Sequence, residues 1–207
     1  SGFAVYDGSN WQEITQLPYG TQLSEVRVIT AGPNNKIYAL VHDYILEIDS
    51  LQPTSIAMIP FLYGTRSNCD IIGVDEQSRI WAVFSGEVNE LFCYDPITDT
   101  WLFLTGGINP KRILSDGMGG VWILDYKLRH IKSDLSIDSL NSSGKPSGDY
   151  QFLFVAPDRK VWVVVSNTLY SFDGTTWTDF SGYSGYPTNG VIAVTCDDAG
   201  NIYAVGI

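Results

Sequence analysis

The sequence is poor in basic residues and contains no long hydrophobic run. Lys and Arg together number 12 against 23 Asp and Glu, which gives a formal net charge of −11 over 207 residues. Such a chain repels phosphate groups, so we expect no nucleic-acid partner. No stretch of 18 or more apolar residues occurs, so we also expect no membrane-spanning helix.

Cysteine and histidine are scarce as well. The chain has three cysteines, Cys69, Cys93 and Cys196, and two histidines, His42 and His130. No C-x-x-C pair and no zinc-ligand spacing is present, so we predict neither a metal site nor a cofactor. An odd number of cysteines leaves at least one unpaired in a monomer. We interpret all three as small apolar residues within strands.

Helical periodicity is hard to find, whereas strand-forming residues are abundant. Short apolar runs rich in Val, Ile, Tyr, Phe and Trp are interrupted every few residues by Gly, Asp, Asn, Ser or Pro. This pattern at short, even spacing is typical of an all-β sandwich, barrel or propeller. The sequence therefore predicts an all-β fold.

A repeat narrows the choice among these folds. An aliphatic β-branched residue followed by an aromatic residue recurs after a polar turn. The aromatic members are Tyr38, Trp81, Trp122, Trp162 and Tyr203, separated by 43, 41, 40 and 41 residues. Each repeat reads as four strands joined by turns, which is the size of one propeller blade. We expect these five aromatic side chains to pack between neighbouring blades.

The two ends of the chain complement each other. Residues 4–11 (AVYDGSNW) mirror residues 169–177 (LYSFDGTTW) at the end of the fourth repeat. If the ends are joined, Asp7 follows Tyr203 by 11 residues, as Asp173 follows Trp162. The sequence thus predicts a five-bladed β-propeller with four antiparallel strands per blade, closed by N-terminal strands that complete the C-terminal blade. A ring with more blades would need a second copy or further sequence.

We expect a single propeller domain over residues 1–207. The predicted blades span about 26–60, 69–105, 112–141 and 150–180, and the last combines 191–207 with 2–15. The N-terminal strands would remove the open sheet edge that invites aggregation.

The repeat pattern, an apolar strand, then D-x-x-G-x-I/V-W/Y, then a strand ending Y/F-D-G-x-x-W, resembles the propeller repeats in sensor domains of bacterial hybrid two-component regulators. The clearest matches are 152–177 and 191–207 continued into 1–11, and 186–190 (YPTNG) is similar to the L-P-x-N lead-in of those repeats. The third repeat departs from the pattern, with KSDL at 132–135. The resemblance implies a propeller sensor or binding domain in an extracellular or periplasmic location. It implies no catalytic residue.

Loops that join the last strand of one blade to the first strand of the next share one face of a propeller. Here they concentrate Tyr, Gly, Ser, Asn and Pro, together with a few basic residues that could receive an anionic group. Aromatic rings beside amides and hydroxyls suit sugars or peptides. The candidate ligand-binding residues are Tyr19, Tyr63, Arg66, Asn109, Lys111, Tyr183, Tyr186 and Asn189. A plainer interpretation is that the tyrosines seal the loops over the core.

Two functional hypotheses follow. The first is a monomeric, non-catalytic module that binds a glycan, a peptide or a protein surface at one composite site near the central channel. The second is a propeller-type lyase or hydrolase with His42 near the channel mouth as a general base. His130 falls two blades away, so we do not expect the two histidines to act as a pair. No G-x-S-x-G or H-E-x-x-H motif is present, and we favour the binding module.

Overall fold

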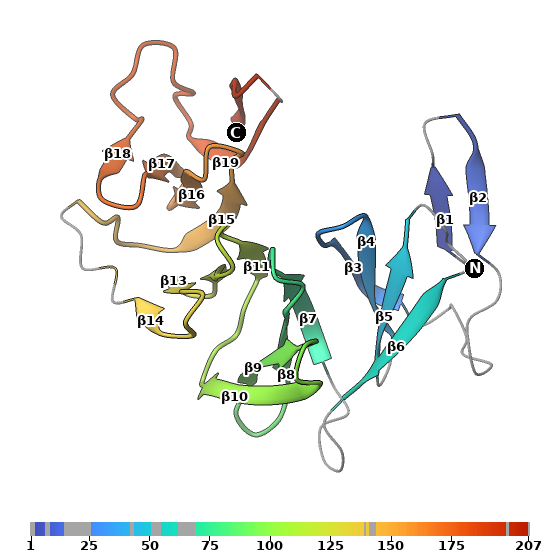
Figure 1. Ribbon diagram of the computed structural model, residues 1–207. Helices are drawn as coiled ribbons and strands as arrows, with labels where there is room; N and C mark the ends of the chain where they lie inside the picture. The colour runs from blue at the N-terminus through green and yellow to red at the C-terminus, as the bar shows by residue number, and fades with distance from the viewer. Residues whose placement is uncertain are drawn as a thin grey trace. The chain divides into compact units, whose positions relative to one another are not determined.

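The computed structural model contains two compact units, residues 1–108 and 109–207. It describes residues 3–6, 9–14, 26–41, 44–50, 55–61, 69–138, 140, 144–197 and 199–206. The regular structure in these ranges consists of strands β1 to β20, labelled in Figure 1. In the described ranges we find no helix of the length and apolarity needed to cross a membrane.

The first unit holds a hairpin and two four-stranded sheets. The hairpin pairs β1 (Phe3–Tyr6) with β2 (Trp11–Ile14). The next sheet has β3 (Val26–Ala31), β4 (Lys36–Val41), β5 (Tyr44–Asp49) and β6 (Ile56–Pro60). The second four-stranded sheet consists of β7 (Cys69–Val74), β8 (Ile80–Phe84), β9 (Glu90–Asp95) and β10 (Thr100–Gly106). Every neighbouring pair is antiparallel and consecutive in the chain.

The second unit repeats this plan in reverse order. One sheet has β11 (Arg112–Ser115), β12 (Val121–Leu124), β13 (Leu128–Ile131) and β14 (Ile137–Asp138). The next has β15 (Tyr150–Val155), β16 (Val161–Val165), β17 (Thr168–Phe172) and β18 (Trp177–Asp179). The hairpin of β19 (Val191–Cys196) and β20 (Ile202–Gly206) follows. Within each of these sheets, neighbouring strands are again antiparallel and consecutive in the chain.

The second strand of each four-stranded sheet carries the core. Every residue of β8, β12 and β16 is buried. Within the first unit, Tyr38 of β4 packs in one apolar cluster with Ile72 and Val74 of β7. Within the second, Trp122 of β12 packs with Leu153 of β15. Side chains on a strand point alternately to its two faces, so a strand buried throughout lies between two apolar layers.

The all-β prediction is confirmed, and so is the four-stranded antiparallel sheet as the repeating unit. Four of the five repeat aromatics are buried, as expected for packing between sheets. Tyr203 differs, since 56% of its surface is exposed. It lies in the two-stranded β19–β20 hairpin, which provides less cover than a four-stranded sheet.

The cysteines behave as apolar strand residues. All three are free: Cys69 in β7 and Cys93 in β9 are buried, and Cys196 ends β19 half-buried. Burial raises the pKa of both Cys69 and Cys93 to about 12. Because the thiolate is the reactive form, these two thiols are inert at neutral pH.

Candidate functional site

A pocket of about 450 Å³ lies at one end of the β15–β18 sheet, in the second unit. It is formed by the turn between β16 and β17 and by the loop from β18 to β19. Its lining residues are Ser166, Asn167, Thr168, Ser181, Tyr183, Tyr186, Pro187, Thr188, Asn189 and Gly190. The lining carries hydroxyls, amides and aromatic rings but no charged side chain.

The floor of the pocket is a tight hairpin turn at Ser166 and Asn167. Both residues have left-handed backbones, with φ of 48° and 65°. Two consecutive left-handed residues form the type I′ turn that matches the twist of a two-strand hairpin, and Asn is favoured there. The Ser166 amide donates to the Asp149 carbonyl at 2.9 Å, and the Val191 amide donates to the Asn167 carbonyl at 2.7 Å. The turn is therefore fixed from both neighbouring loops.

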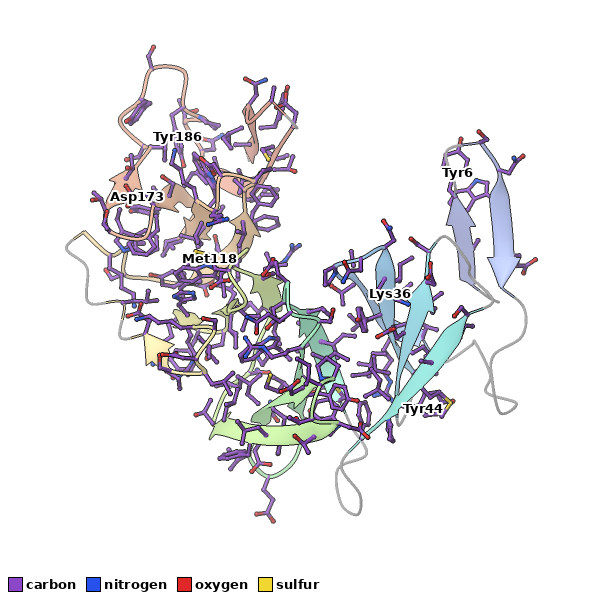
Figure 2. The ribbon with its side chains drawn as sticks, in the orientation of Figure 1. Tyr6, Lys36, Tyr44, Met118, Asp173 and Tyr186 are labelled. Atoms are coloured by element: carbon purple, nitrogen blue, oxygen red, sulfur yellow. The ribbon has the colours of Figure 1, made fainter. Side chains whose placement is uncertain are left out.

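Tyr186 fastens the 181–190 loop to the sheet. Its hydroxyl accepts a hydrogen bond from the Leu169 amide at 2.8 Å and donates to the Asn167 carbonyl at 3.4 Å. The side chain is half-buried against the strands (Figure 2). Tyr186 thus has the sealing role that we considered as the plainer interpretation of the loop tyrosines.

Tyr183 is placed differently, at the open side of the same pocket. It is 59% exposed, and its ring lies 5.1 Å from that of Phe180. Phe180 in turn lies 5.1 Å from the ring of the buried Trp162. This row of rings supports Tyr183 from the core outward. An exposed aromatic face beside amide and hydroxyl groups suits a sugar ring or a peptide.

The structure brings three of the eight predicted ligand-binding residues together. Tyr183, Tyr186 and Asn189 line the one pocket. Asn109 is exposed and does not line it. The other predicted residues Tyr19, Tyr63 and Arg66, and the candidate base His42, lie outside the described residues.

Two basic residues near the loops, Lys111 and Arg112, are engaged in structural contacts. The Lys111 ammonium donates to the Tyr150 carbonyl at 2.9 Å and lies 3.5 Å from the Asp149 carboxylate. The Arg112 guanidinium lies 4.5 Å from the centre of the Phe152 ring. Lys111 and Arg112 therefore connect two sheets of the second unit, and neither lines the pocket.

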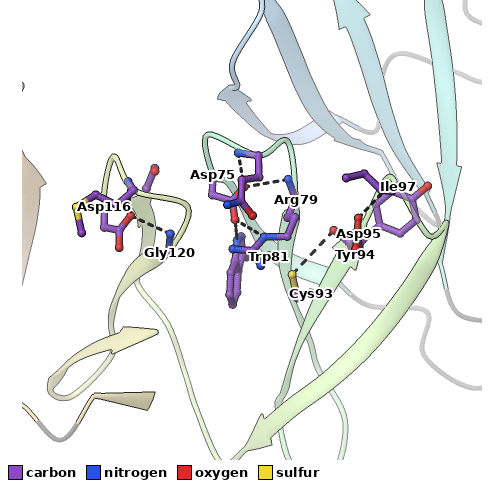
Figure 3. A network of polar contacts seen from close by, with 12 residues as sticks. Asp75, Arg79, Trp81, Cys93, Tyr94, Asp95, Ile97, Asp116 and Gly120 are labelled. Carbon is purple, nitrogen blue, oxygen red and sulfur yellow. Dashed lines mark hydrogen bonds and ion pairs between the residues drawn. The ribbon is translucent and has the colours of Figure 1, made fainter. Parts of the chain in front are cut away.

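At the opposite end of the sheets, turn aspartates hold the first and second strands together. One oxygen of Asp75 accepts the backbone amides of Gln77 and Arg79 at 2.9 and 3.0 Å. Its other oxygen accepts Arg79 Nε at 2.8 Å and the Trp81 indole at 2.9 Å (Figure 3). We call this arrangement the turn clasp: an aspartate, the amides two and four residues later, and an aromatic donor six residues later.

The third repeat has a variant of the turn clasp. Asp116 accepts the amides of Met118 and Gly120 at 2.7 and 2.8 Å (Figure 3). Its second oxygen contacts His130 Nε2 at 2.8 Å, and the imidazole stacks on Trp122 with centroids 4.1 Å apart. His130 is thus held as a structural partner within its own sheet, as its position in β13 leads one to expect.

The turn clasp was not predicted from the sequence. Its signal in the sequence is a constant spacing of six residues, from Asp75, Asp116 and Asp197 to Trp81, Trp122 and Tyr203 respectively. These acids act as hydrogen-bond acceptors. Within the described part of the chain, no three His, Cys, Asp or Glu side chains gather closely enough to hold a metal ion.

No protein-family model matches the sequence, and no curated protein matches it. Several solved structures, however, are similar to this chain in fold. The chain is similar to YCF48 bound to D1 peptide, with a TM-score of 0.61 and 14% identity over 98% of this chain and 65% of that one. It is similar to YCF48 from Cyanidioschyzon merolae, with a TM-score of 0.59 and 16% identity over 95% of this chain and 68% of that one.

The chain is also similar to the extracellular domain of the putative hybrid two-component system BT3049 from B. thetaiotaomicron. That match has a TM-score of 0.58 and 17% identity, and it covers 97% of this chain and 29% of that one. Identities this low show the fold alone, which is of the β-propeller type. The resemblance to the sensor domains of hybrid two-component regulators is therefore confirmed for the fold.

Proposed function

We propose that this chain is a non-catalytic binding module of the propeller type, and that its ligand sits in the pocket lined by Tyr183. One observation carries the proposal. An exposed aromatic ring, supported by Phe180, stands beside polar groups on a turn that two loops hold in place. A site fixed before the ligand arrives loses little conformational freedom on binding.

The chemistry of the pocket narrows the class of ligand. Because no charged side chain lines it, the ligand should be uncharged where it contacts the pocket. The main chain of a peptide or a sugar ring meets this condition, since both offer donors and acceptors beside an apolar face. Support for a peptide or protein ligand comes from a propeller of similar fold, YCF48, which was solved with a D1 peptide.

We further propose that the five repeats form one closed, monomeric ring over residues 1–207. The proposal rests on the repeat spacing and on four four-stranded sheets flanked by two hairpins, β1–β2 and β19–β20. An extracellular or periplasmic location is proposed because propellers of similar fold are extracellular domains of putative hybrid two-component systems. The lyase or hydrolase hypothesis depends on His42, outside the described residues, and no described contact favours it.

The test is a glycan and peptide array, read together with thermal shift, on the wild type and on Tyr183→Ala. We expect one ligand class to bind the wild type and to lose at least about tenfold in affinity in the variant, about 1.4 kcal/mol. Tyr126→Ala is the matched control, because Tyr126 is 63% exposed and does not line the pocket. Equal binding by Tyr183→Ala, or no ligand on either array, would contradict the proposal.

A further inference from the structure

A second cavity lies at the other end of β16, beside the turn between β15 and β16. In two other repeats, the aromatic residue of the second strand donates to a turn aspartate. The Trp81 indole donates to Asp75 at 2.9 Å, and the Tyr203 hydroxyl donates to Asp197 at 3.0 Å. In both cases the acceptor stands six residues before the donor.

The fourth repeat has the donor without the acceptor. Ala156 stands six residues before Trp162, where Asp75 and Asp197 stand in their repeats. The turn backbone is the same, since the Ala156 amide donates to the Lys160 carbonyl at 2.9 Å and the Asp75 amide donates to the Arg79 carbonyl at 3.1 Å. Trp162 is 7% exposed. In the described part of the chain, its indole nitrogen is the one buried side-chain nitrogen or oxygen without a hydrogen-bond partner.

Such a donor is unusual, because buried polar groups are nearly always hydrogen-bonded. Trp162 also lines a cavity of about 540 Å³. Ala156, Asp158 and Lys160 line the cavity on one side, and Gly200 and Ile202 of the β19–β20 hairpin line it on the other. The cavity therefore lies next to the position where the missing carboxylate would stand.

We propose that this cavity binds a carboxylate from another molecule, the Asp or Glu side chain of a peptide, which takes the place of the missing turn aspartate. The carboxylate accepts the hydrogen bond of the Trp162 indole, as Asp75 does from Trp81. Lys160 supplies a cation at the same place. Its ammonium lies 3.2 Å from Asp158 in an exposed ion pair, from which an entering carboxylate can draw it.

Entry requires a small movement of the turn, because the indole nitrogen itself is covered. The side chains of Asp158 and Lys160 are exposed and can move without disturbing the core. This site differs from the Tyr183 pocket, which lies at the β16–β17 end of the same sheet. An experiment can therefore disprove ligand binding at one of these two sites without affecting the proposal for the other.

The test follows the indole N–H of Trp162 by NMR during titration with two blocked tripeptides, Gly-Asp-Gly and Gly-Asn-Gly. Trp162→Phe assigns the resonance among the six tryptophans. We expect Gly-Asp-Gly to shift this resonance downfield in a saturable manner. We expect Gly-Asn-Gly to bind at least about tenfold more weakly, because charged acceptors make the stronger hydrogen bonds.

Ala156→Asp is the decisive variant, since it restores the aspartate found in the second, third and fifth repeats. Its Trp162 resonance should lie downfield without peptide and should no longer respond to Gly-Asp-Gly. Tyr183→Ala should respond like the wild type, which separates this site from the proposed function. An unresponsive wild-type resonance, equal responses to the two peptides, or an unchanged response in Ala156→Asp would overturn the proposal.

Discussion

At the scale of single residues, Asp75 illustrates how one carboxylate can hold a turn together. It is 1% exposed and accepts four hydrogen bonds, from two amides, one guanidinium and one indole. Removing one partner of a buried ion pair leaves the other charge without compensation, which costs more than the pair contributes. We therefore expect the stability of the fold to be sensitive to substitution of the turn-clasp aspartate.

We predict that Asp75→Ala lowers the free energy of unfolding by about 3 kcal/mol or more, because Arg79 and Trp81 lose their buried acceptor. Urea denaturation measures the loss. Asp134→Ala is the control, since Asp134 is an exposed turn residue that accepts two hydrogen bonds from Ser136. The control variant should lower the free energy of unfolding by about 1 kcal/mol or less. Equal losses in the two variants would show that burial of the turn clasp is unimportant.

Asp173 gives a prediction about pH. The amide of Thr176 and the hydroxyl and amide of Thr175 stabilise its charged form and lower its pKa to about 2. A carboxyl whose pKa is lowered by folding contributes stability above its unfolded pKa of about 3.9 and loses it as the pH falls through the folded pKa. The contribution should therefore disappear between about pH 4 and pH 2.

The measurement is acid unfolding of the wild type and of Asp173→Asn. The asparagine keeps an oxygen acceptor but does not titrate, so its stability should fall less steeply over that pH range. Parallel profiles for the two proteins would mean that the turn hydrogen bonds of Asp173 do not contribute to acid stability.

At the scale of elements, the 181–190 loop depends on a glycine at its end. Gly190 has φ of +93°, and a Cβ there would lie 2.6 Å from the Asn167 carbonyl oxygen. That oxygen also accepts the Val191 amide and the Tyr186 hydroxyl. Any side chain at position 190 would therefore push the loop away from the turn that forms the pocket floor.

We predict that Gly190→Ala lowers the free energy of unfolding by about 1–3 kcal/mol more than Gly185→Ala does, as measured by chemical denaturation. Gly185 is a matched control, because it also has a positive φ, of 82°, but a Cβ there would meet nothing within 4 Å. Both variants pay for the left-handed backbone, about 1–2 kcal/mol, and only Gly190→Ala adds the clash. Equal costs would contradict the close approach of the loop to Asn167.

The elements themselves were largely predictable from the sequence. A β-branched residue followed by an aromatic one recurs because the second strand of each four-stranded sheet is wholly or largely buried, and such residues fill that space well. Contacts of long side chains were not predictable. Lys111 reaches the Tyr150 carbonyl, 39 residues away, and nothing in its local sequence indicates that contact.

The candidate site was predictable only in part, because the sequence shows which residues stand in a loop but not which of them the loop buries. Tyr183 and Asn189 could be chosen because they stand beside glycines in a loop between repeats. The roles of Tyr183 and Tyr186 could not be separated, since burial depends on the fold of the loop. The spacing alone does not single out Trp162, because both Gly32 and Ala156 stand where other repeats have an acid. The missing hydrogen-bond partner of the Trp162 indole is visible only in the structure.

At the scale of the whole molecule, the central claim is that the repeats close into one ring. In the proposed ring the fifth repeat is equivalent to the fourth, and this equivalence predicts the register of closure. In the β15–β18 sheet, Val163 pairs with Tyr170. The equivalent positions of the proposed fifth blade are Ala204 and Ala4, which stand one residue after Tyr203 and three before Asp7. Directly opposed residues of antiparallel strands have Cβ atoms about 4.5–5.5 Å apart, close enough for a disulfide after small adjustment.

The most direct measurement is therefore the cross-linking of Ala4→Cys/Ala204→Cys under mild oxidation, in a Cys196→Ser background that removes the half-buried thiol. Cys69 and Cys93 can stay because they are buried. If the ring closes, the monomer should form an intramolecular disulfide in high yield, seen by intact mass and by faster migration on a non-reducing gel. Single-cysteine variants should show neither change. Free thiols that persist, or disulfide-linked dimers as the main product, would contradict closure of the five repeats into one ring.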